Sequence, residues 1–210
     1  MSSRTILKEL NRKYYPIISR KYGPYIRLFS LRRSLAKGVF LIPQKYCIFY
    51  FKDLARGMAG KTPRSNGNIY IRKEAFSERI LVHEYIHRLS INLKRVGCFK
   101  YRKVHGFCVD DKLYYYSGIN EIMTEWITYS ITGIKVDNIY QRYLYLIDEL
   151  KKQIGEQAFQ KIIFSYFNND VTLINCILDT YCEGGANKKL QELSDLVFGG
   201  QTDMTFHFIV

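Results

Sequence analysis

The sequence lacks the features of a membrane or secreted protein. No run of 18 consecutive apolar residues occurs among its 210 residues, so we expect no membrane-spanning helix. The N-terminus has no apolar core typical of a secretion signal, and charged residues recur through residue 33. The sequence therefore predicts a cytoplasmic protein. Delivery without a leader stays open.

Cysteine is scarce and irregularly placed. There are five cysteines, an odd number, and no two of them form a Cys-x-x-Cys pair. This pattern argues against a framework of disulfides and against a zinc ribbon. The cysteines are expected to be free thiols, mostly buried, in a reducing compartment.

Acidic residues are few. The sequence has 19 Asp and Glu residues and 32 Lys and Arg residues, which gives a formal net charge of +13. Such a charge attracts polyanions and acidic partners, and the basic residues are densest, among aromatic ones, in the first 37 positions. However, the excess is not gathered in one basic run as in a typical nucleic-acid footprint. The excess of basic residues is also explained by the composition typical of AT-rich genomes, whose proteins are rich in Lys, Ile, Asn and Tyr together.

Short apolar segments come first and helical patterns later, which predicts the α+β class. Beyond two N-terminal helices, at 2–22 and 25–36, we expect strands at 39–42, 46–51 and 68–72 and a loop at 56–68. Ser77 is expected to cap a strong helix that runs to Leu93, and an irregular insert with a possible hairpin follows to residue 118. Helices are then expected at 119–133, 138–153, 156–168, 170–182 and 186–198, before a tail at 203–210.

The most informative segment is His83-Glu84-Tyr85-Ile86-His87. On a helix, residues four apart lie on one face, so the two imidazoles can bind one zinc ion. Glu84 then points beside the metal, where it can take a proton from a metal-bound water and pass it to a leaving amine. Coincidental packing of two histidines at a helix edge is the plain alternative.

A third ligand is needed, and its position decides the family. The pattern of a metzincin would need Gly at 90 and His at 93, where this chain has Ser90 and Leu93. The segment that starts the next predicted helix offers Glu121 and Glu125, one turn apart, with Asn120 as a candidate cap. Glu121 is placed to reach the zinc, and Glu125 to accept the other ring N–H of a ligating histidine.

Other residues of the insert compete for the role of third ligand. His105, Cys98 and Cys108 all lie between the two motifs. A cysteine or histidine in place of Glu121 would make a different zinc site, such as a closed structural one.

The two motifs together resemble those of the gluzincins, the thermolysin-like zinc metallopeptidases. The resemblance covers residues 66 to 130 and implies one zinc ion per chain, with His83, His87 and Glu121 as ligands and Glu84 as general base. Glu125 matches the acidic position beside the ligands. Asn68, Ile69 and Tyr70 fall where the family has the edge strand that aligns an extended substrate. A tyrosine before the glutamate ligand holds the oxyanion in the family, and Tyr115 is the candidate here.

The resemblance also implies a zincin-like fold in one domain over residues 1–210. A sheet and the motif helix would form an N-terminal lobe (1–96), the insert (97–118) would line the cleft, and helices would form a C-terminal lobe (119–210). The expected activity is zinc-dependent hydrolysis of a peptide or protein substrate. The alternative is a basic protein on the same fold that binds nucleic acid or regulates, with weak or no catalysis.

Overall fold

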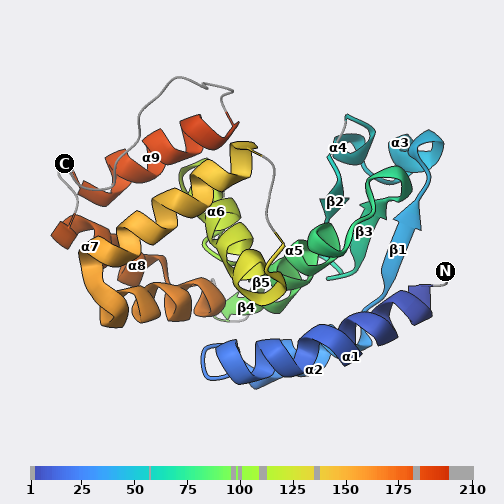
Figure 1. The fold of residues 1–210 in the computed structure, drawn as a ribbon, viewed down its shortest axis with the longest axis horizontal. Coiled ribbons are helices and arrows are strands. Elements are labelled where there is room, and N and C mark those ends of the chain that lie inside the picture. Colours follow the sequence, from blue (N-terminus) through green and yellow to red (C-terminus); the bar gives the residue numbers. More distant parts are fainter. Residues whose placement is uncertain are drawn as a thin grey trace.

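The fold is rich in helix and contains two small sheets, in agreement with the α+β class (Figure 1). The computed structural model describes residues 3–56, 58–95, 98, 101–108, 113–134, 138–181 and 185–198. The predicted tail at 203–210 lies outside these residues. None of the described helices is both long enough and apolar enough to cross a membrane.

The N-terminal half builds one mixed sheet against two helices. It contains α1 (Ser3–Tyr22), α2 (Leu28–Ala36), β1 (Val39–Ile42), the short turns η1 (Gln44–Tyr46), α3 (Cys47–Tyr50) and α4 (Lys52–Ala55), then β2 (Gly60–Lys61), β3 (Ile69–Arg72) and η2 (Lys73–Ala75). The strand order is β1-β3-β2, with β1 parallel and β2 antiparallel to β3.

The second half is helical apart from one hairpin. Helix α5 (Glu78–Leu89) leads directly into the antiparallel pair β4 (Ile91–Arg95) and β5 (Tyr101–His105). The remaining helices are α6 (Leu113–Thr132), α7 (Asn138–Asn168), α8 (Val171–Tyr181) and α9 (Gly185–Phe198). Figure 1 shows α5 between the sheet and this group of helices.

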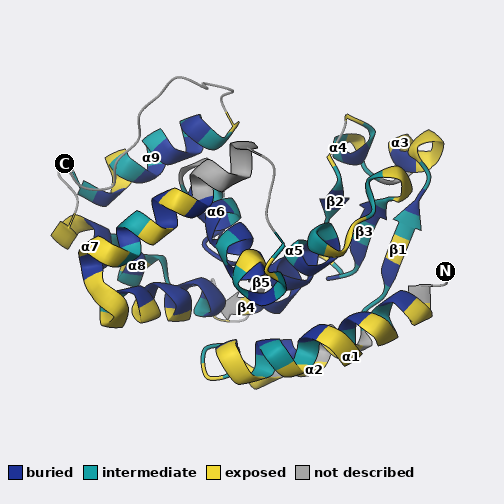
Figure 2. Cartoon of the chain, viewed as in Figure 1, coloured by how far each residue is buried: buried dark blue, intermediate teal, exposed yellow. Residues whose placement is uncertain are grey.

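One hydrophobic core runs through both predicted lobes (Figure 2). The apolar stripe of α1 contributes Ile6, Leu10 and Ile18, and α9 at the other end of the chain contributes Leu190 and Leu193. All five side chains are almost fully buried. Helix α5 is buried over most of its length inside this core, so its polar side chains are held in fixed positions.

Several predicted elements are confirmed with small shifts. Ser77 caps α5, since its hydroxyl accepts a hydrogen bond from the Ile80 amide. The helices predicted at 138–153 and 156–168 form α7, which is broken at Gly155, where φ is +80°. The hairpin expected in the insert is present as β4 and β5, but it begins earlier than predicted, because α5 ends at Leu89 and Leu93 belongs to β4.

Three predictions about local structure are wrong. Residues 46–50 of the apolar run 46–51 are helical rather than extended, because Cys47 and Leu54 turn inward into a small core of their own beside Ile42. Only Phe51, between α3 and α4, has an extended backbone. The residues Tyr114 to Tyr116, predicted within an irregular insert, lie at the start of α6. Asn120 consequently lies inside this helix, where its side chain accepts a hydrogen bond from the Phe107 amide instead of capping.

Candidate metal centre

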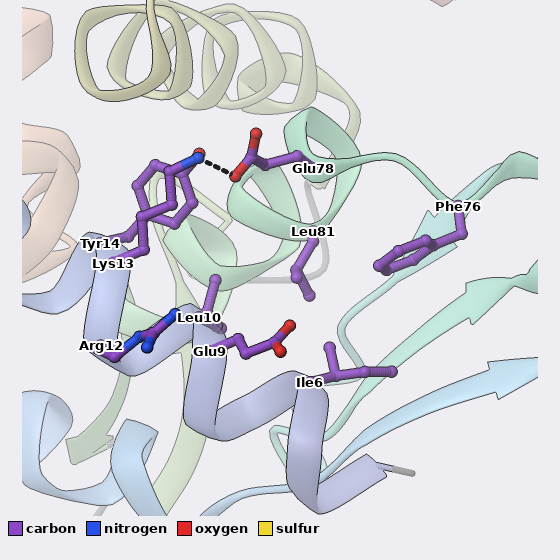
Figure 3. A pocket seen from close by; sticks show the side chains of 9 residues that line it. All are labelled: Ile6, Glu9, Leu10, Arg12, Lys13, Tyr14, Phe76, Glu78 and Leu81. Atoms are coloured by element: carbon purple, nitrogen blue, oxygen red, sulfur yellow. Dashed lines mark hydrogen bonds and ion pairs between the residues drawn. The ribbon is translucent and has the colours of Figure 1, made fainter. Parts of the chain in front are cut away.

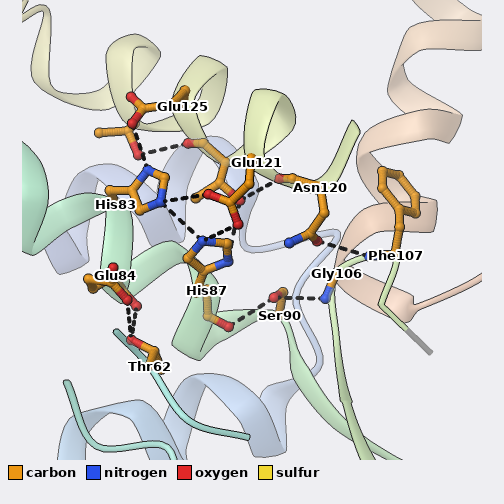
Figure 4. A network of polar contacts seen from close by, with 12 residues as sticks. Thr62, His83, Glu84, His87, Ser90, Gly106, Phe107, Asn120, Glu121 and Glu125 are labelled. Carbon is orange, nitrogen blue, oxygen red and sulfur yellow. Dashed lines mark hydrogen bonds and ion pairs between the residues drawn. The ribbon is translucent and has the colours of Figure 1, made fainter. Parts of the chain in front are cut away.

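Helices α5 and α6 bring the two sequence motifs face to face (Figure 4). Nε2 of His83 lies 3.0 Å from Nε2 of His87. The carboxylate of Glu121 reaches across from α6, with Oε2 lying 3.3 Å from Nε2 of His83 and Oε1 lying 3.3 Å from Nε2 of His87. The three side chains are grouped closely enough to hold a single metal ion, as the sequence predicted.

Glu125 lies one turn beyond Glu121 and supports the first histidine. Its Oε1 is 2.9 Å from Nδ1 of His83, and its two oxygens accept hydrogen bonds of 2.6 and 2.7 Å from Arg79. The carboxylate is buried, so Arg79 supplies the charge that such a group requires. A carboxylate at Nδ1 fixes the ring so that Nε2 presents its lone pair to the metal position.

Without a metal, the electrostatics of the cluster favour charged groups. Burial disfavours the charged form of His83, but Glu125 and Glu121 outweigh it and raise the pKa of this histidine well above its usual value. Burial likewise acts to raise the pKa of Glu121, yet His87 and His83 outweigh it and lower that pKa well below its usual value. The cluster is therefore held together by ion pairing in the metal-free protein.

Glu84 lies beside the two histidines on α5 and points toward β2. Its Oε2 lies 2.8 Å from the Thr62 hydroxyl, and only 6% of the residue is exposed. Burial raises the pKa of Glu84, while the neighbouring histidines act in the other direction. A buried carboxyl group with a raised pKa is suited to take up and release a proton near neutral pH.

A cavity of about 450 Å³ opens over these side chains. Residues 58–62, which contain β2, line one side, and Ile80, Val197 and Phe198 supply apolar lining, the last two from the end of α9. His83, Glu84, His87, Glu121 and Glu125 all line the same cavity. The site is thus open to a ligand, and it has both apolar and ionisable lining.

His105 is part of this cavity but is not grouped with the three candidate ligands. Its ring stacks on that of His87 with centroids 5.5 Å apart, and its Nδ1 is buried without a hydrogen-bond partner among the described residues. Burial lowers the pKa of His105 to about 3, so the ring is neutral. Sequence analysis considered His105 only as a ligand; the β4–β5 pairing, which sets it opposite Ile91, brings it to this position.

The predicted substrate strand is corrected by the sheet order. Ile69 and Tyr70 belong to β3, which is paired on both sides, with β1 and with β2, and Asn68 directly precedes it. A strand paired on both sides cannot accept an extended peptide. Strand β2 borders the cavity instead and pairs only with β3 in the described part of the chain. Its two-residue length left no strand pattern in the sequence.

The remaining sequence candidates are placed as follows. Tyr115 belongs to the first turn of α6, but its side chain lies outside the described part of the chain. Cys108 is buried, and burial raises the pKa of its thiol to about 12. Cys98 is exposed. Neither cysteine joins the metal cluster.

A second cavity, of about 380 Å³, lies between α1 and α5 (Figure 3). It combines apolar side chains such as Ile6 and Leu81 with the exposed ion pair of Lys13 and Glu78. No group of metal-ligating side chains faces it among the described residues.

Comparisons of the chain with protein-family models, with curated proteins and with solved structures found no match.

Proposed function

We propose that this chain is a zinc-dependent peptidase of the gluzincin type. The observation that carries the proposal is the geometry of the three donor groups around one point in an open cavity, with Glu84 at their side. Two histidines and one glutamate are the donor set of a catalytic zinc site, which leaves a position for water or substrate.

The spacing of the donors supports zinc in particular. Ligand atoms at 2.0–2.1 Å from a tetrahedral zinc ion are about 3.3 Å apart. Here the two histidine nitrogens are 3.0 Å apart, and each of them lies 3.3 Å from a different oxygen of Glu121. Two imidazole nitrogens and one carboxylate are the wrong type of donor and too few for calcium, which prefers six to eight oxygen ligands.

Each polar side chain then has a defined task. A bound zinc ion would polarise the substrate carbonyl and lower the pKa of a water molecule to about 7. Glu84 takes the proton from the attacking water and returns it to the leaving amine. Thr62 orients the Glu84 carboxylate through its hydroxyl, and Glu125 orients His83.

Strand β2 is the element we expect to align the substrate. It lies at the edge of the three-stranded sheet and borders the cavity. An extended peptide can add to such a strand through main-chain hydrogen bonds, which do not depend on the substrate side chains. This role replaces the one that Asn68 to Tyr70 had in the sequence prediction.

His105 is the described residue best placed to hold the oxyanion. Its neutral ring lines the cavity beside His87 and carries one N–H that can donate. A donor aimed at the developing negative charge stabilises the transition state more than the substrate. Tyr115 remains the second candidate for this task.

The alternative, a protein that binds nucleic acid, has one supporting observation. Arg4, Lys8, Arg12 and Arg20 are all exposed along α1. Such a row of cations can contact phosphates. Binding of duplex DNA at low salt that falls steeply as salt is raised, in a protein without hydrolytic activity, would favour this alternative.

The test combines metal content with hydrolysis. Protein purified without a metal-affinity tag should contain about one zinc ion per chain by plasma mass spectrometry. Glu84→Gln should keep the zinc and lose hydrolysis of fluorescein-labelled casein, whereas His83→Ala should lose both. Casein cleavage by Glu84→Gln at the rate of the unaltered protein would reject the mechanism.

A further inference from the structure

A small helical cap at one end of the sheet exposes an unusual set of side chains. The cap consists of η1, α3 and α4, residues 44–55, with Arg56 following directly, and it joins β1 to the strands beside the cavity (Figure 1). In α3, Phe49 is 80% exposed and Ile48 is 65% exposed, and Tyr46 just before them is 46% exposed. Figure 2 shows this outer surface as exposed.

The exposure of these side chains is imposed by the way the cap is built. Cys47 and Leu54 are fully buried against Ile42 and form a small core, separate from the main one. Phe51 packs onto it, with its ring 4.8 Å from that of Tyr70. Since these residues occupy the inner side of the cap, Ile48 and Phe49 are left facing outward. A contiguous apolar patch of this kind marks an interaction surface.

The charges around the patch identify the chemistry of its partner. Lys45, Lys52 and Arg56 are exposed on the same cap. Asp53, the single carboxylate in residues 44–56, is already paired with Lys61. Lys45 and Lys52 form no ion pair with a carboxylate in the described ranges. The surface therefore combines protruding apolar and aromatic side chains with a surplus of positive charge.

We propose that this cap binds the surface of a membrane that contains anionic lipids. An aromatic ring and a branched aliphatic side chain can enter the boundary between headgroups and acyl chains, while flanking Lys and Arg side chains contact anionic headgroups. A protein partner with an apolar surface would not use the three cations unless it were also acidic.

The position of the cap gives the proposal a consequence for the cavity. The chain passes from α4 through Met58, which lines the cavity and is 49% exposed, into β2. A membrane held at the cap would therefore lie near one edge of the candidate site. The proposal concerns binding and does not depend on the chain being a peptidase.

Co-sedimentation with lipid vesicles tests the proposal. Two vesicle types are compared at 0.15 M salt, phosphatidylcholine alone and phosphatidylcholine with 30% phosphatidylserine. We expect the unaltered protein to sediment with the second type, and Ile48→Ser/Phe49→Ser to bind it roughly tenfold more weakly. Lys45→Glu/Lys52→Glu should weaken binding at least as much, because two attractive charges become repulsive.

Matched variants elsewhere on the surface serve as controls. Leu28→Ser/Phe164→Ser removes two apolar side chains that are 60% and 43% exposed, and Lys161→Glu/Lys188→Glu makes the same change of charge at two exposed lysines on α7 and α9. Both should bind vesicles within about twofold of the unaltered protein, since charges away from the contact are screened at this salt.

Three outcomes would overturn the proposal. The first is equal loss of binding in the cap variants and the controls, and the second is no sedimentation with either type of vesicle. The third is self-association in analytical ultracentrifugation that Ile48→Ser/Phe49→Ser abolishes, in a protein that does not bind vesicles. That result would assign the cap to a contact between two copies of the chain.

Discussion

Gly60 in β2 lies directly against the side chain of Glu84 in α5. A β carbon built on Gly60 would be 2.8 Å from both Cγ and Oε1 of Glu84, closer than any ordinary contact. The glycine therefore sets the position of the candidate general base from outside the motif. Figure 4 shows that Thr62, the residue directly after β2, holds the same side chain through a hydrogen bond from its hydroxyl to the Glu84 carboxylate.

The first prediction follows from this contact. Gly60→Ala should displace the Glu84 carboxylate and lower the hydrolysis rate by about 10- to 100-fold, because small errors in the position of a reacting group are costly. The zinc content should not change, since Gly60 does not contact the donor cluster. Gly133→Ala is the control for backbone strain, because nothing lies within 4 Å of that position and its φ of +64° makes alanine costly there without touching the cavity. Equal losses per folded molecule in both variants would contradict the prediction.

The second prediction concerns the carboxylate behind His83. Glu125→Gln should weaken zinc binding by about 10- to 100-fold, because the ring loses the charged acceptor that orients it. Titration against a chelator of known affinity measures the change. Glu78→Gln removes a carboxylate from the exposed start of α5 and should leave the affinity unaltered. The prediction is wrong if Glu125→Gln binds zinc as tightly as Glu78→Gln.

The third prediction distinguishes His105 from the metal ligands. His105→Phe keeps a flat ring against His87 but removes the N–H donor. We expect kcat to fall about 100-fold, with the zinc content intact, because the loss falls on the transition state. A variant that loses its zinc would instead place His105 among the ligands. An unaltered kcat would show that His105 does not stabilise the oxyanion, and Tyr115 would then be the candidate for this role.

The fourth prediction is the pH dependence of stability in the metal-free protein. The carboxyl pKa of Glu121 is lowered from 4.5, so its stabilising effect is present above this value and is lost as the pH falls through the folded-state pKa. The pKa of His83 is raised from 6.5, so its effect is present below 6.5 and is lost as the pH rises through its higher folded-state pKa. The ion pairs should thus stabilise most between pH 4.5 and 6.5.

The measurement is Tm against pH after removal of metal with a chelator. The difference in Tm between the unaltered protein and Glu121→Gln isolates the contribution of the ion pairs. This difference should be largest inside the window and shrink on both sides. A difference that is constant from pH 4 to pH 9 would show that the ion pairs are absent in solution.

The fifth prediction concerns a buried amide that joins the hairpin to the helices. Asn169 has a left-handed backbone with φ of +58°, donates to the carbonyl oxygens of Ser90 and Gly106, and accepts from Asn92. Asn169→Gly keeps the backbone conformation but leaves these groups unpaired, at a cost of about 2 kcal/mol in the free energy of unfolding. Asn169→Ala should cost about 1 kcal/mol more, since alanine disfavours this conformation. Urea denaturation measures both, and equal losses would contradict the backbone argument.

The sequence predicted the donor cluster well because its spacing is local. His83 and His87 share a face of one helix, and Glu121 and Glu125 share a face of another, so only the meeting of α5 with α6 had to be assumed.

The errors arose where structure depends on distant partners. The strand that contains Tyr70 has the pattern of a strand, but which strand lies at the edge is decided by the pairing of β2, and two residues carry no periodic signal. The run from Tyr46 to Phe51 is apolar enough for a strand. It is helical as far as Tyr50 because Cys47 has a small core to pack into, which no local pattern shows.

The contact of the two α5 histidines with Glu121 of α6 also has a consequence for how long the protein survives before it is degraded. His87 and Glu121 flank the whole hairpin, so a single ion bound between them would close that loop in the folded state alone. Ligand present at 100 times its Kd adds about 2.7 kcal/mol to stability. The concentration of free zinc would then regulate the amount of protein as well as its activity. Molecules without bound zinc would unfold more often and would be degraded first.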